Sequence, residues 1–158
     1  MNMHASEQSD GDHPPPPALP RVRVAIEVEI PSDVRYIDQV VALVTRHCQD
    51  FRFPSRHCSL NVPVALTEAI SNAILRGNLE NRDKHVRVRA VVDSHRIVLE
   101  VTDEGRGFDL EASIIDPTTP DNVFREDGRG LFLMKKLMDR VEQFAVDGNV
   151  VRLTLHRP

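Results

Sequence analysis

The sequence has few cysteines, no excess of basic residues and no long apolar stretch, and each absence excludes a class of protein. The two cysteines, Cys48 and Cys58, give neither a disulfide framework nor the spacing of a metal site, although a bridge between them stays open. Lysine and arginine number 20 against 24 acidic residues, and the net charge of −4 does not indicate a general nucleic-acid-binding face. No apolar run approaches the length of a membrane span, and the N-terminus has no apolar signal segment. We therefore expect a cytoplasmic protein that contacts neither nucleic acid nor a membrane directly.

The 158 residues divide into a short tail and one domain long enough to bury a core of its own. Residues 1–20 are polar and then proline-rich, ending in HPPPPALP, and have little to bury. We expect them to form a disordered or polyproline-like tail, with a docking ligand as the alternative. Residues 21–158 form the predicted domain.

Changes in hydrophobic period divide this domain into strands and helices. Alternating apolar residues predict a strand over Arg21–Ile30, which Pro31 ends because proline cannot continue a strand ladder. A helix capped by Ser32 or Asp33 should follow, running to about Cys48. The remaining expected elements are a loop at 49–59, a helix at 66–78 with Asn61 as a plausible cap, a hairpin at 85–103, a loop at 109–127, a helix from Gly128 or Gly130 to about Arg140, and a hairpin at 141–156. The order predicts an α+β fold, a two-layer α/β sandwich whose mixed, mostly antiparallel sheet carries about three helices on one face.

The stretch from Leu66 to Asn78, LTEAISNAILRGN, is the most informative of the helices. Its apolar residues cluster on one face, and Glu68, Asn72 and Arg76 follow one another at a spacing of four along one edge. An ordinary amphipathic helix with a solvated edge would show the same pattern. Gly77 follows at the position where a left-handed cap would end the helix.

Three features could together form one site. Glu68 and Asn72 offer a carboxylate and an amide one turn apart, suited to holding Mg²⁺ or to placing a base beside a metal. The second feature is DEGRGF, in which Asp103 points with the apolar residues of its strand and can accept a hydrogen bond from an exocyclic amine. There, Gly105 and Gly107 let the backbone approach a flat ligand.

The third feature is GRGL, which opens the last helix. The backbone N–H groups of Gly128 and Gly130 and the helix dipole favour a phosphate there, and Arg129 could add a charged contact. Each motif alone also fits an ordinary turn or helix start. Their order, with a long loop between the last two, is more specific.

This arrangement resembles the GHKL ATPase superfamily, whose Bergerat fold is shared by gyrase-type ATPases and histidine kinases, and most closely the small anti-sigma factor serine kinases of bacteria. EAISNA carries the Glu-x-x-x-Asn motif, DEGRG the first glycine box and GRG the second, and GRGLFLMKKLMDRVE is similar to that subfamily throughout. The resemblance spans about residues 21–157.

The resemblance implies roles for these residues. Asp103 would select adenine, Asn72 would hold Mg²⁺ against the phosphates of ATP, and Glu68 would act as the general base. Gly105 and Gly107 belong to the first glycine box. Gly128 and Gly130 would bring backbone amides to the phosphates, with Arg129 between them, while residues 109–127 close as a lid. Phosphoryl transfer of this kind depends mainly on positioning and charge neutralisation.

Two positions depart from the family pattern. Arg76 stands where the family often has histidine, and we expect its charge to lower the pKa of Glu68 and keep that carboxylate ionised. Asn149 stands where the family usually has a threonine that supports adenine binding, and its amide can still hydrogen-bond.

The subfamily resemblance implies an ATP-dependent serine/threonine protein kinase and anti-sigma factor. It would phosphorylate a STAS-domain antagonist, sequester a sigma factor and commonly form a homodimer, for which the strand Arg21–Ile30 could pair at its edge. The alternative is a nucleotide-dependent switch that binds partners without phosphorylating them. A histidine-kinase catalytic domain is a third hypothesis, disfavoured because the first twenty residues leave no room for a phosphoacceptor helix.

Overall fold

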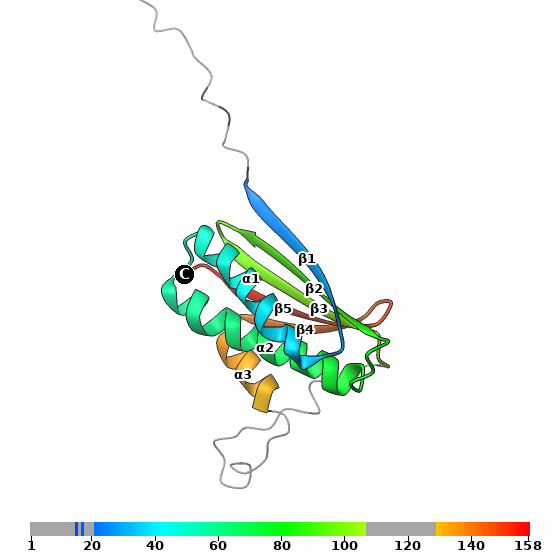
Figure 1. Cartoon of the computed structure of the whole chain (residues 1–158). Helices are drawn as coiled ribbons and strands as arrows, with labels where there is room; N and C mark the ends of the chain where they lie inside the picture. The colour runs from blue at the N-terminus through cyan, green and yellow to red at the C-terminus, as the bar shows by residue number, and fades with distance from the viewer. Residues whose placement is uncertain (1–14, 16, 18–20, 107–128) are drawn as a thin grey trace, which may run out of the picture.

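The computed structural model describes residues 15, 17, 21–106 and 129–158, which form one five-stranded sheet covered on one face by helices (Figure 1). The strand order is β1-β2-β3-β5-β4, and all four pairings among the described strands are antiparallel, so the expected mixed sheet is wrong in that detail. The strands are β1 (Arg23–Pro31), β2 (His85–Asp93), β3 (Arg96–Asp103), β4 (Arg140–Ala145) and β5 (Asn149–His156). The helices are η1 (Val34–Tyr36), α1 (Ile37–Asp50), η2 (His57–Asn61), α2 (Val62–Asn72), η3 (Ala73–Gly77) and α3 (Arg129–Leu137). The predicted α+β sandwich is confirmed.

The core lies between the sheet and the helices. Alternate residues of β2 and β3 are buried, as the period of two predicts, and they meet the apolar faces of α1 and α2. Cys48 and Cys58 are both free thiols inside this core, and burial raises the pKa of Cys48 to about 12. The core therefore explains both cysteines as buried apolar side chains.

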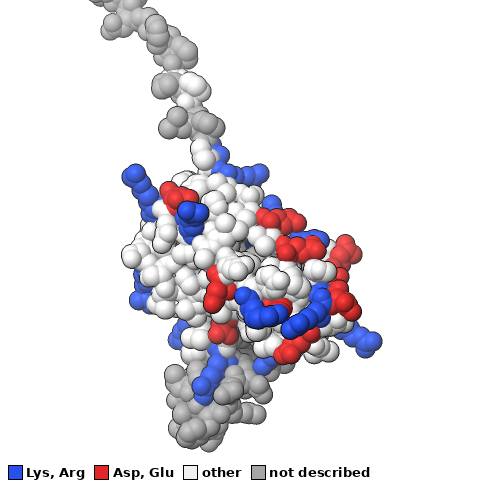
Figure 2. Space-filling model, viewed as in Figure 1, with Lys and Arg blue, Asp and Glu red and all other residues white. Residues whose placement is uncertain are grey.

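The opposite face of the sheet is open and charged. One transverse row of paired residues crosses all five strands with alternating sign, in the order Glu27, Arg89, Glu100, Arg152 and Glu142. In the centre of this charged row, Arg152 donates to Glu100 Oε1 from Nε at 2.9 Å and lies 2.8 Å from it through Nη2. A hollow of about 490 Å³ lies on this face, lined partly by the charged row. On the face shown in Figure 2, acidic and basic side chains lie side by side, as expected for a chain without a basic excess.

The long central helix begins earlier than the sequence indicates. It starts at Ser55, so the expected loop at 49–59 is shorter, and Asn61 lies inside the helix rather than capping it. The Asn61 amide instead donates to the carbonyl of Leu137 at 2.6 Å, which ties α2 to the end of α3. By length and composition alone, the run His57–Gly77 could cross a membrane, contrary to our expectation, with mean hydropathy 1.2. Half of its 18-residue window is buried in this core, as in a central helix of a globular domain.

The connections between elements follow simple turn chemistry. Asp33 caps η1 as predicted, accepting a hydrogen bond from the backbone of Arg35 at 3.0 Å. β1 continues through Pro31, one residue beyond the predicted stop, and this is tolerated because β1 is an edge strand. The predicted tight turns at 93–96 and 147–149 are confirmed, the second with φ of 49° at Asp147 and 122° at Gly148.

Candidate functional site

Asp103, the last residue of β3, is enclosed by three segments of the chain, namely η3, the turn after β3 and the start of β5. It is only 2% exposed, and its carboxylate accepts a hydrogen bond from Gly105 N–H to Oδ1 at 2.9 Å and from Asn149 Nδ2 to Oδ2 at 3.1 Å. A Cβ on Gly77 would lie 2.3 Å from the carboxyl carbon, and a Cβ on Gly105 would lie 2.0 Å from the carbonyl oxygen of Gly77. The absence of side chains at both glycines therefore lets η3 and the turn after β3 approach to backbone contact around this carboxylate.

This contact also explains Gly77, whose predicted left-handed conformation is wrong. The positive φ angles after the helix belong to Leu79 (52°) and Glu80 (57°). Gly77 instead closes a widened last turn, in which the N–H of Asn78 donates to the carbonyl of Ala73 at 2.8 Å. Such π-type turns are frequent at functional sites. Here the turn brings Gly77 beneath Asp103.

Burial raises the pKa of Asp103, while the Asn149 amide, the Gly105 N–H and the charge of Lys84 partly offset that rise. A carboxylate that burial has stripped of water, with two fixed donors, is a strong acceptor for one further donor from a ligand. The exocyclic amine of a purine is such a donor.

Glu68 and Asn72 lie one turn apart on α2, where α3 packs against it. A Cβ on Gly130 would lie 2.3 Å from Glu68 Oε2, so the Glu68 carboxyl lies against the backbone at the start of α3. The structure thus brings together Glu68 and Gly130, which are far apart in the sequence and were both predicted to belong to the site. Arg129 is the first residue of α3 and directly precedes Gly130.

Burial raises the pKa of Glu68, which is opposite to the effect we expected from Arg76. Arg76 is eight residues further along the helix, about 12 Å at the rise of an α-helix, too far for a dominant Coulomb effect. The loss of water acts directly on the Glu68 carboxyl, and it therefore decides that the pKa of Glu68 is raised. A carboxylate with a raised pKa is a better proton acceptor.

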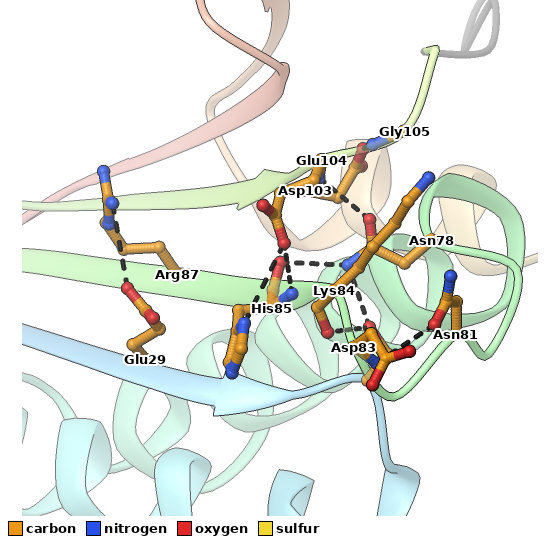
Figure 3. Close-up of polar contacts among 11 residues, drawn as sticks. Glu29, Asn78, Asn81, Asp83, Lys84, His85, Arg87, Asp103, Glu104 and Gly105 are labelled. Atoms are coloured by element: carbon orange, nitrogen blue, oxygen red, sulfur yellow. Dashed lines mark hydrogen bonds and ion pairs between the residues drawn. The ribbon is translucent and has the colours of Figure 1, made fainter.

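Asn78, which the sequence did not single out, connects the site to the rest of the sheet (Figure 3). It is 1% exposed, and its Oδ1 accepts from Glu104 N–H at 2.8 Å, while its Nδ2 donates to Ser32 Oγ and to the carbonyl of His85, both at 2.9 Å. The Glu104 carboxylate in turn accepts from the N–H of His85. Asn78 thereby joins the end of η3 to the residue that follows β1, to β2 and to the turn after Asp103. Its only signal in the sequence is a polar residue directly after the helix.

Several predicted positions lie outside the described residues, namely Gly107, Gly128 and the loop 109–127. Asn149, noted as a departure from the family pattern, lies inside the site, 3% exposed and bonded to Asp103.

The side-chain oxygens of Glu68 and Asn72 are of the type that Mg²⁺ prefers, and they suit an ion that is held mainly by phosphates. Among residues 21–106 and 129–158, no three His, Cys, Asp or Glu side chains gather as a metal cage. Mg²⁺ commonly keeps several waters and takes only one or two protein ligands beside the phosphates of its substrate. Asn72, one turn from Glu68, could provide that protein ligand. The wide hollow on the charged face of the sheet shares no residue with this site.

Comparison with known proteins identifies the family of the chain. Residues 30–155 match the family described as "Histidine kinase-like ATPase domain". A protein named "Serine-protein kinase RsbW" from Bacillus subtilis (strain 168) is 28% identical over 134 residues, 82% of this chain and 83% of that protein. Another of the same name from Oceanobacillus iheyensis is 30% identical over 123 residues, 74% of this chain and 77% of that protein. The "Anti-sigma F factor" of Bacillus velezensis is 32% identical over 98 residues, 60% of this chain and 67% of that protein. The matched segment includes Glu68, Asn72, Asp103 and Asn149, and the chain belongs to the histidine kinase-like ATPase domain family.

Proposed function

We propose that this protein is an ATP-dependent serine/threonine protein kinase that also acts as an anti-sigma factor. The observation that carries the proposal is the position of Glu68, whose partly desolvated carboxyl lies against Gly130 while the same helical run ends beneath Asp103. One continuous helical segment thus carries the candidate base, Glu68, and contacts the candidate adenine acceptor, Asp103, at its C-terminal end. The names of the relatives, serine-protein kinase and anti-sigma F factor, support the same activity.

In this proposal Asp103 accepts a hydrogen bond from the adenine amino group, and the backbone of Gly105 faces the base. Asn72 holds Mg²⁺, which neutralises charge on the phosphates when bound. The N-terminus of α3, with Arg129 and Gly130, contributes phosphate contacts together with Gly128. Gly107, with Gly105, lets the backbone approach the base.

The hydroxyl oxygen of a serine or threonine on the partner attacks the γ-phosphorus, and the bond from phosphorus to the ADP oxygen breaks. The hydroxyl proton passes to the Glu68 carboxylate. Burial raises the pKa of Glu68, which makes its carboxylate a better proton acceptor and favours this role. Most of the rate enhancement comes from positioning and charge neutralisation.

The proposed partners are a STAS-domain antagonist, which receives the phosphate, and a sigma factor, which the protein sequesters in the cytoplasm. A homodimer is also proposed. β1 supports it as an edge strand with one unpaired backbone side, and the helix-facing side chains of Val24, Ile26 and Val28 are only partly buried.

Intact-mass spectrometry tests the proposal. The protein is mixed with ATP, Mg²⁺ and single-domain STAS proteins of the same genome, beside the variant Glu68→Gln and the control Glu80→Gln at an exposed glutamate. We expect one phosphate on a serine or threonine of one partner with wild type and the control, and none with Glu68→Gln. If ATP binds but no partner gains mass, the alternative holds, namely a nucleotide-dependent binding switch without kinase activity.

A further inference from the structure

α3 is tied at both of its ends to the helical run formed by η2 and α2. Near the start of α3, a Cβ on Gly130 would lie 2.3 Å from Glu68 Oε2. At the end of α3, Asn61 Nδ2 donates to the carbonyl of Leu137 at 2.6 Å. The earlier residue of one helix meets the later residue of the other at both contacts, so the two helices lie antiparallel.

The two contacts have the same spacing on both helices. Asn61 precedes Glu68 by seven residues, and Gly130 precedes Leu137 by the same number. Seven residues of α-helix make about two turns and rise about 10.5 Å, so the two contact residues of each helix share one face. A shift of α3 along its axis at one contact therefore moves the other contact by the same distance.

The Asn61 amide is the directional part of this helix pair. Leu131 and Met134 of α3 are buried, but apolar burial is non-directional and restrains sliding along an axis less sharply than a hydrogen bond does. Asn61 is 8% exposed, and its Oδ1 has no hydrogen-bond partner among the described residues, so the bond to Leu137 fixes the orientation of the amide. The carbonyl of Leu137 is one of the last four of α3, which find no donor within the helix itself.

We propose that Asn61, through the carbonyl of Leu137, holds the phosphate-binding end of α3 in its position against Glu68. The inference rests on the nucleotide-binding function proposed above. Asn61 lies about two helical turns from Glu68 and acts through α3 rather than on the nucleotide, so it is a positioning residue. A misplacement of about 1 Å at the start of α3 would weaken the bonds from its first N–H groups to a phosphate.

The base end of the site does not depend on this bond. Asp103 is enclosed by η3, the turn after β3 and the start of β5, none of which belongs to α3. Loss of the Asn61 bond should therefore weaken the binding of phosphates and spare the binding of the base. ATP and adenosine, which lacks phosphates, distinguish these two effects.

The test is the ratio of the ATP and adenosine dissociation constants, measured with Mg²⁺ by NMR titration of the full chain. Asn61→Leu removes the donor while keeping a side chain of similar length, and Asn61→Ala removes it without adding bulk. We expect both variants to bind ATP about tenfold or more weakly and adenosine as wild type does. Ser59→Ala is the control, because Ser59 is exposed on the same helical run and donates to the carbonyl of Ser55 at 2.7 Å.

The outcomes separate this inference from the proposed function. If wild type binds neither ATP nor adenosine, the proposed function fails and the inference with it. If wild type binds both and the Asn61 variants keep its ratio, the inference alone is overturned, even where their Tm falls, since a merely structural role predicts that result. An equal loss of ATP and adenosine affinity also overturns it. Asn61→Ala decides the matter if Asn61→Leu does not fold.

Discussion

Replacing Asn78 by alanine should destabilise the fold far more than an ordinary loss of a polar side chain. The Asn78 amide makes three hydrogen bonds, of 2.8, 2.9 and 2.9 Å, to groups on three other segments of the chain. The variant leaves the N–H of Glu104 and the carbonyl of His85 without these partners. Ser32 Oγ keeps its own bond to the carbonyl of Lys84 at 2.8 Å, so the loss at that residue is smaller.

The magnitude follows from these partners. A net loss of about 1 kcal/mol per hydrogen bond, increased where a buried group is left unsatisfied, gives about 2–4 kcal/mol in the free energy of unfolding. For a domain of this size that corresponds to a decrease in Tm of about 5–15 °C. The loss is a large part of a typical stability of about 5–15 kcal/mol.

Urea unfolding of wild type and Asn78→Ala, followed by circular dichroism, measures this loss. Asn81→Ala is the matched control, because Asn81 is exposed and its side chain accepts from the N–H of Asp83 at 3.0 Å in the same turn. We expect the control to change the unfolding free energy by less than about 0.5 kcal/mol. A loss below about 1 kcal/mol for Asn78→Ala, or one equal to the control, would refute the reasoning.

Three further predictions concern the site and the chain end. Burial raises the pKa of Glu68 from its ordinary 4.5, so ionising it costs stability as pH rises from that value through the folded pKa. Glu68→Gln should therefore have a higher Tm than wild type at neutral pH and lose this advantage in acid, and a difference independent of pH would contradict the linkage. Gly77→Ala places a Cβ 2.3 Å from the Asp103 carboxyl carbon and should weaken ATP binding about tenfold or more in calorimetry. Unchanged affinity would show that the backbone around Asp103 shifts to accommodate the Cβ at little cost. Arg157 lies 4.2 Å from the ring centroid of Phe53 and donates to three carbonyls, so Arg157→Ala should lower the unfolding free energy by about 1–3 kcal/mol in urea, and no loss would mean that water replaces these bonds.

The alternating strands could be predicted because their period is local. β2 and β3 begin and end where the sequence indicates, since one face is buried along their whole length and the other is at least partly exposed and mostly polar. The start of the long helix could not be read in the same way. Asn61 is a good cap by residue type, but its partner is the carbonyl of Leu137, which only the tertiary structure brings near.

The site shows the same limit. Glu68, Asn72 and Asp103 stand out because their spacing and face are visible in the sequence. The functions of Gly77 and Asn78 depend on a backbone contact between η3 and the turn after β3, separated by more than twenty residues. The pKa of Glu68 depends on burial, which a charge pattern along one helix does not report.

The charged row across the open face of the sheet has a consequence for self-association. Its signs, negative at both edges and alternating between them, read the same from either edge, since Glu27 and Glu142 flank Arg89, Glu100 and Arg152. If two copies met face to face with their rows aligned by a twofold axis, every charge would oppose its like, whether the axis ran along the row or along the strands. A twofold axis along the strands but placed between β3 and β5 shifts one copy by one strand, keeps the symmetry and sets Glu100 against Arg152 and Arg89 against Glu142. The charged row therefore disfavours a fully overlapped face-to-face pair of copies, more strongly at low ionic strength, and favours a pair offset by one strand.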